Sequence, residues 1–381
     1  MTDDLPYLDD VHRMLRETLR RFVEKEIVPQ GEIWERDGYV PREVLRAMGR
    51  HGFLGLRVPE RYGGGALDTL ASALLAEELG RSTFGGFAIT VLVHTDMASP
   101  HLLNAGTPEQ LERWLPGVVA GEQITAVAVT EPDAGSDVKG IRTRARRDGD
   151  EWLLSGSKLF ITNGVHADLY FVAAKTAPEA GAKGISMFAV EKGATGFTVS
   201  RSLDKMGWRS SDTAELSFDN CRIPAANLLG EEGRGFYAIM KNFQNERIVI
   251  GAMAMGEAAR ALELTVEYVK TRRAFATTLW DKQVVRQRLA MLAAKVAAGR
   301  QLVYYAAWLD AQGRDCVKEV SMVKAYCGEL VNEVMYTCQQ FHGGFGYMRE
   351  AAIERMARDA RVQSIGGGAT EVMLEEVAKR L

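Results

Sequence analysis

Thr125-Ala126-Val127-Ala128-Val129-Thr130-Glu131-Pro132-Asp133-Ala134-Gly135-Ser136-Asp137 is the stretch at which this chain changes from helical patterns to β-type patterns. Its alternating Ala and Val residues favour a strand that is packed on both faces. Pro132 and Gly135 stop the strand and force a tight loop that exposes backbone N–H groups. Small residues in this loop would let a flat or anionic ligand approach the main chain, and the hydroxyls of Thr130 and Ser136 add donors and acceptors. An ordinary strand exit uses the same residue types and is the alternative interpretation.

Helical patterns fill the residues before this stretch. Apolar residues recur at helical spacing over residues 8–31, and further helices are expected over residues 41–51 and 68–80, the last with Asp68 as its N-cap. Thr107-Pro108-Glu109-Gln110 is a capping box with Pro at the first helical position, and it predicts a helix that ends near Gly121. We therefore expect a helical domain over residues 1–122.

Short runs of β-type residues follow Gln123. Separated by Gly, Asn and Asp, they predict strands over residues 152–154, 159–162, 169–174, 185–190, 197–200 and 214–218. These strands predict a β-domain over residues 123–228. Within it, Asn163-Gly164 follows alternating apolar residues, which is typical of a β-hairpin turn.

Long helical periodicities return after Pro224. They cover residues 236–272, 283–312 and 315–341, and two shorter ones lie beyond Ala351. Long helices joined by short loops predict a helix bundle, which we assign to residues 229–381. No low-complexity linker separates the three parts of the sequence, so we expect them to pack as one body.

The composition is that of an ordinary soluble protein. With 381 residues, 46% of them hydrophobic, the chain can form two or three cores, and its net charge of −3 lacks the basic excess of a nucleic-acid binder. No apolar run reaches the ~18 residues of a membrane span, and no signal segment is recognised. The four cysteines lack CxxC spacing, so we expect neither disulfides nor a metal site, and a reducing, cytoplasmic location fits best.

Asn245-Glu246-Arg247 places a carboxylate and a guanidinium at the edge of a stripe that should be buried, because Ile248-Val249-Ile250 follows directly. Burial raises the pKa of a carboxyl group, which is how a general base is poised near neutral pH. An ion pair between the neighbouring side chains on a surface helix is the alternative interpretation.

Two glycine-rich segments follow predicted helices in the C-terminal part. Gln340 to Gly346 would supply backbone N–H groups without side chains in the way, and Ile365 to Glu371 would offer an anion cradle at the start of a new helix. Helix ends also use Gly simply to stop, and a triple Gly can be a hinge, so both segments have a purely structural alternative.

In order and spacing, these motifs resemble those of the acyl-CoA dehydrogenase family, most closely the long-chain and isovaleryl-CoA dehydrogenase type. The resemblance runs from the first predicted helix to Leu381. It implies an α+β multidomain fold with an N-terminal helical domain, a middle β-barrel or sandwich domain and a C-terminal four-helix bundle, usually assembled as a homotetramer. The matching motifs are Thr130-Glu131-Pro132, Ala134-Gly135-Ser136-Asp137, Ile161-Thr162-Asn163-Gly164, Met206-Gly207, Ser211-Asp212-Thr213, Arg272 to Phe275 and Gln340 to Gly344.

The resemblance implies FAD as the cofactor, bound between the last two domains. The residues implied to hold the flavin ring are Val127, Val129, Thr130, Gly135, Ser136, Phe160, Ile161 and Thr162. Those implied to hold the pyrophosphate and adenosine, across a subunit boundary, are Arg272, Phe275, Gln283, Gln340, Gly343, Gly344, Ala369, Thr370 and Glu371. Phe160 stands where a Trp is common, which keeps an aromatic lid, and Ala369 departs from the usual Thr.

The implied reaction is FAD-dependent α,β-dehydrogenation of an acyl-CoA thioester to the trans-2-enoyl-CoA, as in fatty acid β-oxidation and lipid metabolism, with a long or branched acyl group and an electron-transfer flavoprotein as acceptor. Glu246 is implied as the catalytic base, because Gly366 to Ala369 replaces the Tyr-Glu-Gly-Thr loop that carries the base in other members. The backbone N–H of Gly367 is implied as a donor to the enolate oxygen. The residues implied to line the substrate site are Ser136, Tyr237, Gln244, Asn245, Glu246, Arg247, Gly367 and Gly368.

Two other classes of function stay open at this stage. Flavin monooxygenases and nitroalkane oxidases resemble the same family but generally lack a Glu at the positions discussed. A non-catalytic or DNA-associated relative, or an inactive partner subunit of a mixed tetramer, is the second class. The mild acidity and the intact flavin loops argue against it, and bleaching of flavin absorbance by acyl-CoA without oxygen would separate the classes.

Overall fold

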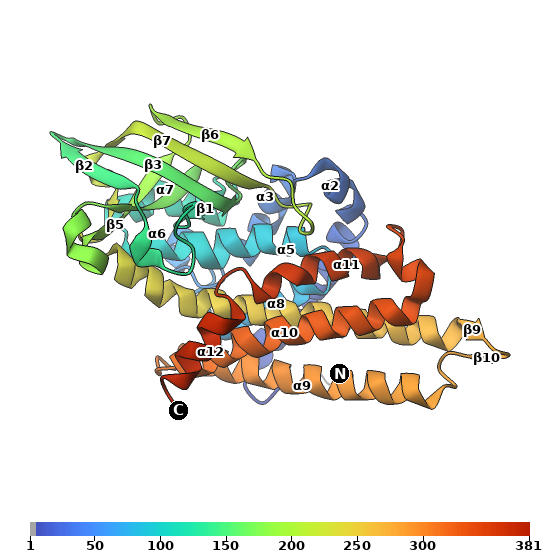
Figure 1. The fold of residues 1–381 in the computed structure, drawn as a ribbon. Helices are drawn as coiled ribbons and strands as arrows, with labels where there is room; N and C mark the ends of the chain where they lie inside the picture. Colours follow the sequence, from blue (N-terminus) through green and yellow to red (C-terminus); the bar gives the residue numbers. More distant parts are fainter. Residues whose placement is uncertain (1–4) are drawn as a thin grey trace.

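A computed structural model describes residues 5–381 and shows a helical N-terminal part, a sheet in the middle and a helical C-terminal part (Figure 1). The sheet occupies the top of the view and the long C-terminal helices run along the bottom. Helices α5 (Gly85–Leu92) and α6 (Ser99–Ala105) lie between the two. The fold class expected from the sequence is confirmed.

The N-terminal helices begin where the sequence signals place them. Asp68 caps α4 (Thr69–Gly80) by accepting from Leu70 N, and the capping box at Thr107 starts α7 (Pro108–Val119). The stretch between residues 85 and 105 is helical as well, which agrees with the expected helical domain, although the sequence patterns marked no individual helix there. The remaining helices are α1 (Asp10–Phe22), α2 (Gly31–Asp37) and α3 (Arg42–Arg50), with π-helical turns at Val23–Ile27 and at Val93–Ala98.

Helix α4 is buried along its whole length, from Thr69 to Gly80. It packs against α8 (Gly235–Thr271) at almost backbone contact, since a Cβ on Gly80 would lie 2.3 Å from the carbonyl oxygen of Met253. A Cβ on Gly256 would lie 2.1 Å from the carbonyl oxygen of Glu77. Only glycine fits at these two positions without moving a helix.

The middle part is one eight-stranded sheet with the strand order β6-β7-β3-β2-β4-β5-β8, and β1 pairs with β4 in parallel. Its strands are β1 (Thr125–Ala128), β2 (Arg144–Asp148), β3 (Glu151–Thr162), β4 (Leu169–Lys175), β5 (Ile185–Glu191), β6 (Phe197–Ser202), β7 (Thr213–Pro224) and β8 (Leu228–Leu229). The two strands expected over 152–154 and 159–162 are one irregular strand, β3, and β2 was not expected.

The Asn163-Gly164 turn does not form the expected hairpin. Asn163 has a left-handed φ of 63°, and Gly164 N donates to Ile161 O, so the tight turn exists. However, β3 pairs with β2 and β7, whereas the next strand, β4, pairs with β1, β2 and β5. The Asn163 amide is used instead to join elements, because its Nδ2 donates to Thr90 O in α5 and to Thr125 O in β1.

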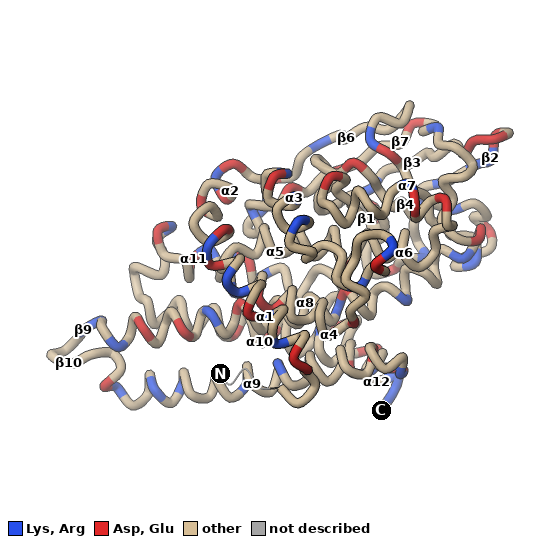
Figure 2. Tube along the Cα trace, turned by 180° about the vertical axis from the view of Figure 1, so that it is seen from behind, with Lys and Arg blue, Asp and Glu red and all other residues tan. Residues whose placement is uncertain are grey.

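The C-terminal part contains three long helices, α8, α9 (Gln283–Ala311) and α10 (Val317–His342), rather than four. Two shorter helices, α11 (Ala352–Ala360) and α12 (Thr370–Ala378), follow. A small hairpin of β9 (Arg273–Ala274) and β10 (Thr277–Thr278) joins α8 to α9 and projects from the end of the bundle, as both views show (Figures 1 and 2). Figure 2 also shows positive and negative residues interspersed along the described trace.

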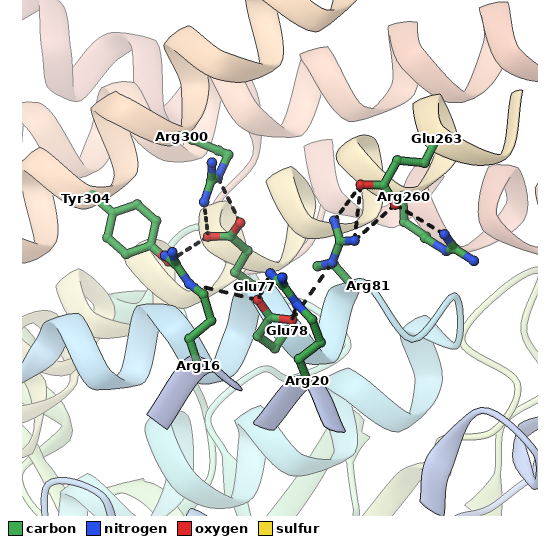
Figure 3. Close-up of polar contacts among 9 residues, drawn as sticks. All are labelled: Arg16, Arg20, Glu77, Glu78, Arg81, Arg260, Glu263, Arg300 and Tyr304. Atoms are coloured by element: carbon green, nitrogen blue, oxygen red, sulfur yellow. Dashed lines mark hydrogen bonds and ion pairs between the residues drawn. The ribbon is translucent and has the colours of Figure 1, made fainter. Parts of the chain in front are cut away.

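A buried network of charges fastens α4 to the helices around it (Figure 3). Glu77 of α4 lies 2.8 Å from the Nε of Arg300 in α9 and accepts from the hydroxyl of Tyr304. Its neighbour Glu78 accepts from Arg20 of α1 at 2.9 Å. Both carboxylates are almost fully buried, so their partners are needed to compensate the loss of hydration.

None of the helices in the described residues combines the length and the apolar character that crossing a membrane requires.

Candidate active site

The loop after β1 is held next to β3 by a buried ion pair. Thr130 O accepts from Leu159 N at 2.9 Å, and the ammonium of Lys158 donates to the Glu131 carboxylate at 2.8 Å. The same carboxylate accepts from Thr143 N, so it bridges the loop and the entry to β2. Burial of Lys158 lowers its pKa to about 8. These contacts bring the Thr130 to Ser136 segment and the end of β3 together, as the sequence motifs predicted.

Phe160 lies at the irregularity of β3 and projects from it. Its side chain is 65% exposed, and its φ of 61° is left-handed, which costs a bulky residue on the order of 1–2 kcal/mol. Strain of this kind is found where a functional site holds a side chain outward. Across from it, a Cβ on Gly135 would meet no atom within 4 Å, so the backbone there is open to a ligand. A flat ring system fits a loop pair with these two properties.

Glu246 lies in the first half of α8 and is 7% exposed. Burial raises the pKa of its carboxyl group from 4.5 to about 8. Asn242, one helical turn earlier, donates to its Oε1 at 2.9 Å. In the described residues Glu246 forms no ion pair, and the guanidinium of Arg247 lies instead over the ring of Phe243. The surface ion pair that the sequence left open is therefore absent from the described residues, and α8 presents a buried carboxyl group with a raised pKa.

The glycine loop between α11 and α12 faces the same part of α8. A Cβ on Gly367 would lie 2.5 Å from Cδ1 of Ile250, which is one turn beyond Glu246. Lys324 of α10 braces the loop, because its ammonium donates to Gln363 O and to Gly368 O at 2.6 and 2.8 Å. Gly367 has a φ of 66°, which favours glycine.

The potential beside this loop is positive. Burial lowers the pKa of the Arg247 guanidinium, and burial together with Arg247 lowers the pKa of Lys324 to about 8. The Nε of Arg247 is buried and has no hydrogen-bond partner in the part of the chain that the structure describes. Gly368 is close by, since a Cβ on it would lie 3.6 Å from that Nε. A ligand oxygen that gains negative charge here would be stabilised.

Other residues expected at the substrate site lie around this centre. Ser136 is exposed in its loop, and Lys139 of the same loop lies over the ring of Phe236, next to Tyr237 in the first turn of α8. Gln244 and Asn245 line a cavity of about 510 Å³ together with Arg57 and with Asn242, which hydrogen-bonds Glu246. The structure thus gathers Glu246, Arg247, Gly367 and Gly368 on one side of α8 and places Gln244 and Asn245 at this neighbouring cavity.

The residues expected to hold pyrophosphate and adenosine lie at the far end of the bundle. Arg272 ends α8, and Phe275 in the projecting hairpin is 92% exposed. Gln283 begins α9, and Gln340, Gly343 and Gly344 lie at the end of α10, which Tyr268 of α8 joins by donating to His342 O. Within one chain this group lies far from β1 (Figure 1).

Ala369, Thr370 and Glu371 begin α12. Ala369 is the N-cap residue and provides no side-chain cap, while the Thr370 hydroxyl donates to the Glu329 carboxylate at 2.7 Å. Glu371 is exposed in the first turn. Their role toward an adenosine stays a prediction.

Sequence reasoning missed three residues that support the site. Asn242 had a signal, because a polar residue four positions before a buried acid lies on the same face of a helix. Lys158 and Lys324 carry no such signal, since their ammonium groups reach backbone carbonyls and an acid of distant segments.

The class of protein that combines a helical domain, a sheet and a second helical domain with a buried acid beside a glycine loop is identified by comparison with known proteins. Family models for the acyl-CoA dehydrogenase N-terminal, middle and C-terminal domains match residues 9–122, 126–221 and 233–381. The chain belongs to the acyl-CoA dehydrogenase family, and it is an enzyme of that family.

The relatives cover nearly the whole chain. A mouse long-chain specific acyl-CoA dehydrogenase of mitochondria is 42% identical over 97% of this chain and 86% of its own length. An isovaleryl-CoA dehydrogenase of Pongo abelii is 35% identical over 97% of this chain and 88% of its own length. Among solved structures, an acyl-CoA dehydrogenase from Geobacillus kaustophilus has 42% identity and a TM-score of 0.95, with 99% of both chains covered. A glutaryl-CoA dehydrogenase from Mycobacterium smegmatis in complex with FADH2 has 30% identity and a TM-score of 0.93, with 99% of this chain and 96% of that chain covered.

Proposed function

We propose that this enzyme oxidises a long-chain or branched acyl-CoA thioester to its trans-2-enoyl-CoA with FAD as the cofactor. The observation that carries the proposal is that Glu246, which is buried and forms no ion pair among the described residues, lies one helical turn of α8 before Ile250, which the Gly367 loop faces. The long-chain and isovaleryl relatives support a long or branched acyl group. Buried, unpaired thiols at all four cysteines support a reducing compartment such as the cytoplasm.

Glu246 acts as the base that removes the α-proton of the thioester. That proton is only weakly acidic, so the enolate oxygen must be stabilised while the proton leaves. The Gly367 N–H is the donor we assign to this oxygen, and Arg247 and Lys324 place positive charge beside the loop. Bound FAD supplies an acceptor for the hydride from the β-carbon. With a pKa of about 8, the Glu246 carboxyl group is only partly ionised at neutral pH, and the ionised form is the one that accepts the α-proton.

Three features of the loops after β1 and at the end of β3 suit the binding of FAD. The open backbone at Gly135, the outward ring of Phe160 and the Lys158–Glu131 pair behind them form a rigid, accessible edge for a flat ring. The hairpin with Arg272 and Phe275 lies too far from this edge to serve the same cofactor within one chain. We therefore infer that the hairpin reaches FAD in a neighbouring subunit of a homotetramer, and that an electron-transfer flavoprotein reoxidises the enzyme.

The direct test is anaerobic mixing of the purified enzyme with a panel of straight-chain and branched acyl-CoAs. We expect loss of the flavin absorbance, fastest with long or branched members. An FAD-containing protein that no acyl-CoA of the panel bleaches, but that consumes oxygen with an added reductant, would contradict the proposal and identify a monooxygenase.

We predict that FAD retention and assembly are linked. The purified protein should be yellow and tetrameric, and Arg272→Ala should lower its flavin content, because the substituted side chain is exposed in the single chain. Light scattering with absorbance detection measures both quantities. A monomer with full flavin content would show that the hairpin is not shared, and Arg201→Ala, an exposed change on β6, is the control that should retain FAD.

A further inference from the structure

We infer that Asn242 is a positioning residue for the base: its amide, anchored on a carbonyl of the N-terminal helices, holds the Glu246 carboxylate in the orientation that removes the substrate proton. The inference rests on the proposed role of Glu246. Asn242 is 5% exposed and touches Glu246 through its Nδ2, at 2.9 Å from Oε1.

The π-helical turn Val93–Ala98 presents two backbone carbonyls to α8, and the local sequence frees one of them. Pro100 has no N–H, so the carbonyl of Asp96, four residues earlier, lacks its α-helical donor. Asn245 supplies one, since its Nδ2 donates to Asp96 O at 2.8 Å. Next to it, Met97 O accepts from the Nδ2 of Asn242 at 2.9 Å. Two asparagines of α8 therefore dock on carbonyls that this turn presents.

These contacts fix which way the Asn242 amide points. A carbonyl oxygen accepts hydrogen bonds only, and Met97 O therefore requires the NH2 group on its side. The second N–H of that group then points at Glu246 Oε1. The amide offers the base a donor and no acceptor, which favours the ionised carboxylate over the protonated acid. Without this donor, burial would raise the pKa of Glu246 against only the charge of Arg247.

The charged groups around Asn242 are held by other partners. Asp96 of the π-helical turn accepts from the Thr95 hydroxyl, and Arg57 of the segment before α4 donates to Asn245 Oδ1 at 2.6 Å. Arg247 of α8 lies over Phe243, and Lys324 of α10 binds the glycine loop. Among the described residues, Asn242 is thus the group that hydrogen-bonds the base.

The test measures proton abstraction without turnover. The probe is 3-thiaoctanoyl-CoA, whose α-proton is acidic but whose β-position is sulfur and carries no hydride. Its enolate, stacked on oxidised flavin, gives a long-wavelength absorbance, and the pH at which this absorbance reaches half its maximum reports the proton affinity of the base. Asn242→Leu keeps the size of the side chain and removes the donor.

We expect Asn242→Leu to raise this midpoint by about one pH unit and to slow flavin reduction about tenfold at pH 7, with recovery at higher pH. The matched control is Asn227→Leu, which also loses a buried amide-to-carbonyl bond, to Ala189 O at 2.8 Å, but lies before α8 and does not contact Glu246. The control should lose stability and keep the wild-type midpoint.

Asn242→Asp provides a second variant of nearly identical shape, and it should raise the midpoint further by placing a second acid beside the base. If both Asn242 variants form the enolate with the wild-type midpoint, Asn242 has only a structural role and the inference is wrong. If the wild type forms no enolate and its flavin is not reduced by acyl-CoA, the proposed function itself fails, which is a different result.

Discussion

Glu246→Gln should slow the reduction of flavin by acyl-CoA about 10²–10⁴-fold, because the amide keeps the size and hydrogen bonding of the side chain but cannot accept the α-proton. Anaerobic stopped-flow absorbance measures the rate, with flavin content as the check on the site. In the wild type, the rate at low acyl-CoA should rise with pH around a midpoint of about 8, since the ionised form is the active one. Glu246→Gln should lose this dependence.

The same substitution should stabilise the fold. The pKa of Glu246 is raised from 4.5 to about 8 in the folded protein, so the folded state holds this proton more tightly than the unfolded state. The contribution to stability is therefore present below pH 4.5 and is lost as the pH rises toward 8. At pH 7 the free energy of unfolding is lower by about 3 kcal/mol for this reason, and the Glu246→Gln variant does not have this loss. Denaturant unfolding at several pH values measures this difference in stability. A Glu246→Gln variant that has its full flavin content and reduces flavin at a near wild-type rate would contradict the assignment of Glu246 as the base.

A carboxylate from the opposite wall offers a test of position. Gly367→Glu in a Glu246→Gly background should restore some activity, but the new Cβ would lie 2.5 Å from Cδ1 of Ile250. Ile250→Val removes that methyl group alone. We therefore expect the variant that also carries Ile250→Val to recover more activity than the one that keeps Ile250.

Arg300→Met should destabilise the fold by about 3–5 kcal/mol, because it leaves the carboxylate of Glu77 buried without its ion-pair partner. Glu77 and Arg300 face each other between α4 and α9 (Figure 3) and are only 4% and 6% exposed, so water can replace little of the lost ion pair. Urea unfolding of the enzyme, followed by circular dichroism, measures the change. The effect should be the largest single loss of stability among the charged residues of the network.

Arg260→Met is the matched control for this prediction. The residue belongs to the outer end of the same network, where Arg260 and Glu263 are about one-third exposed and 3.2 Å apart. An exposed pair contributes roughly 0–1 kcal/mol, so the control should unfold close to the wild type. Equal losses for the two variants would show that burial does not decide the contribution of these pairs.

Much of the fold could be predicted because local signals agree with it. The capping box at Thr107 and the N-cap at Asp68 mark helix starts that the structure confirms within a residue. Helix α5 was missed because Gly85 to Leu92 is buried on all sides and so carries no amphipathic period. Strand β2 was missed because its arginine-rich sequence is mostly exposed. The Asn163-Gly164 hairpin failed because tertiary pairing, which no local pattern encodes, gave β3 other partners.

In the candidate site, too, some residues could be predicted from local sequence and others could not. Glu246 was predictable, since its position before an apolar run and the acid-free glycine loop both point to it. The bracing of that loop by Lys324 depends on a backbone carbonyl at residue 363, far along the chain, and no spacing rule connects the two. Likewise, the anchor of Asn242 exists only because the carbonyl of Met97 and α8 meet in the folded protein.

The complete burial of α4 bears on how this protein is made. A ribosome releases residues 69–80 long before Met253, which packs on the helix, and Arg300, which pairs with Glu77, have been synthesised. Arg20 of α1 is already available to Glu78, but at the usual 5–20 residues per second roughly ten seconds or more pass in which Glu77 has no ion-pair partner and the apolar face toward α8 is uncovered. We therefore expect the N-terminal segment to complete its folding only after α8 and α9 have been made, and a fragment that ends before α8 should not fold on its own, even though a family model describes residues 9–122 as a domain.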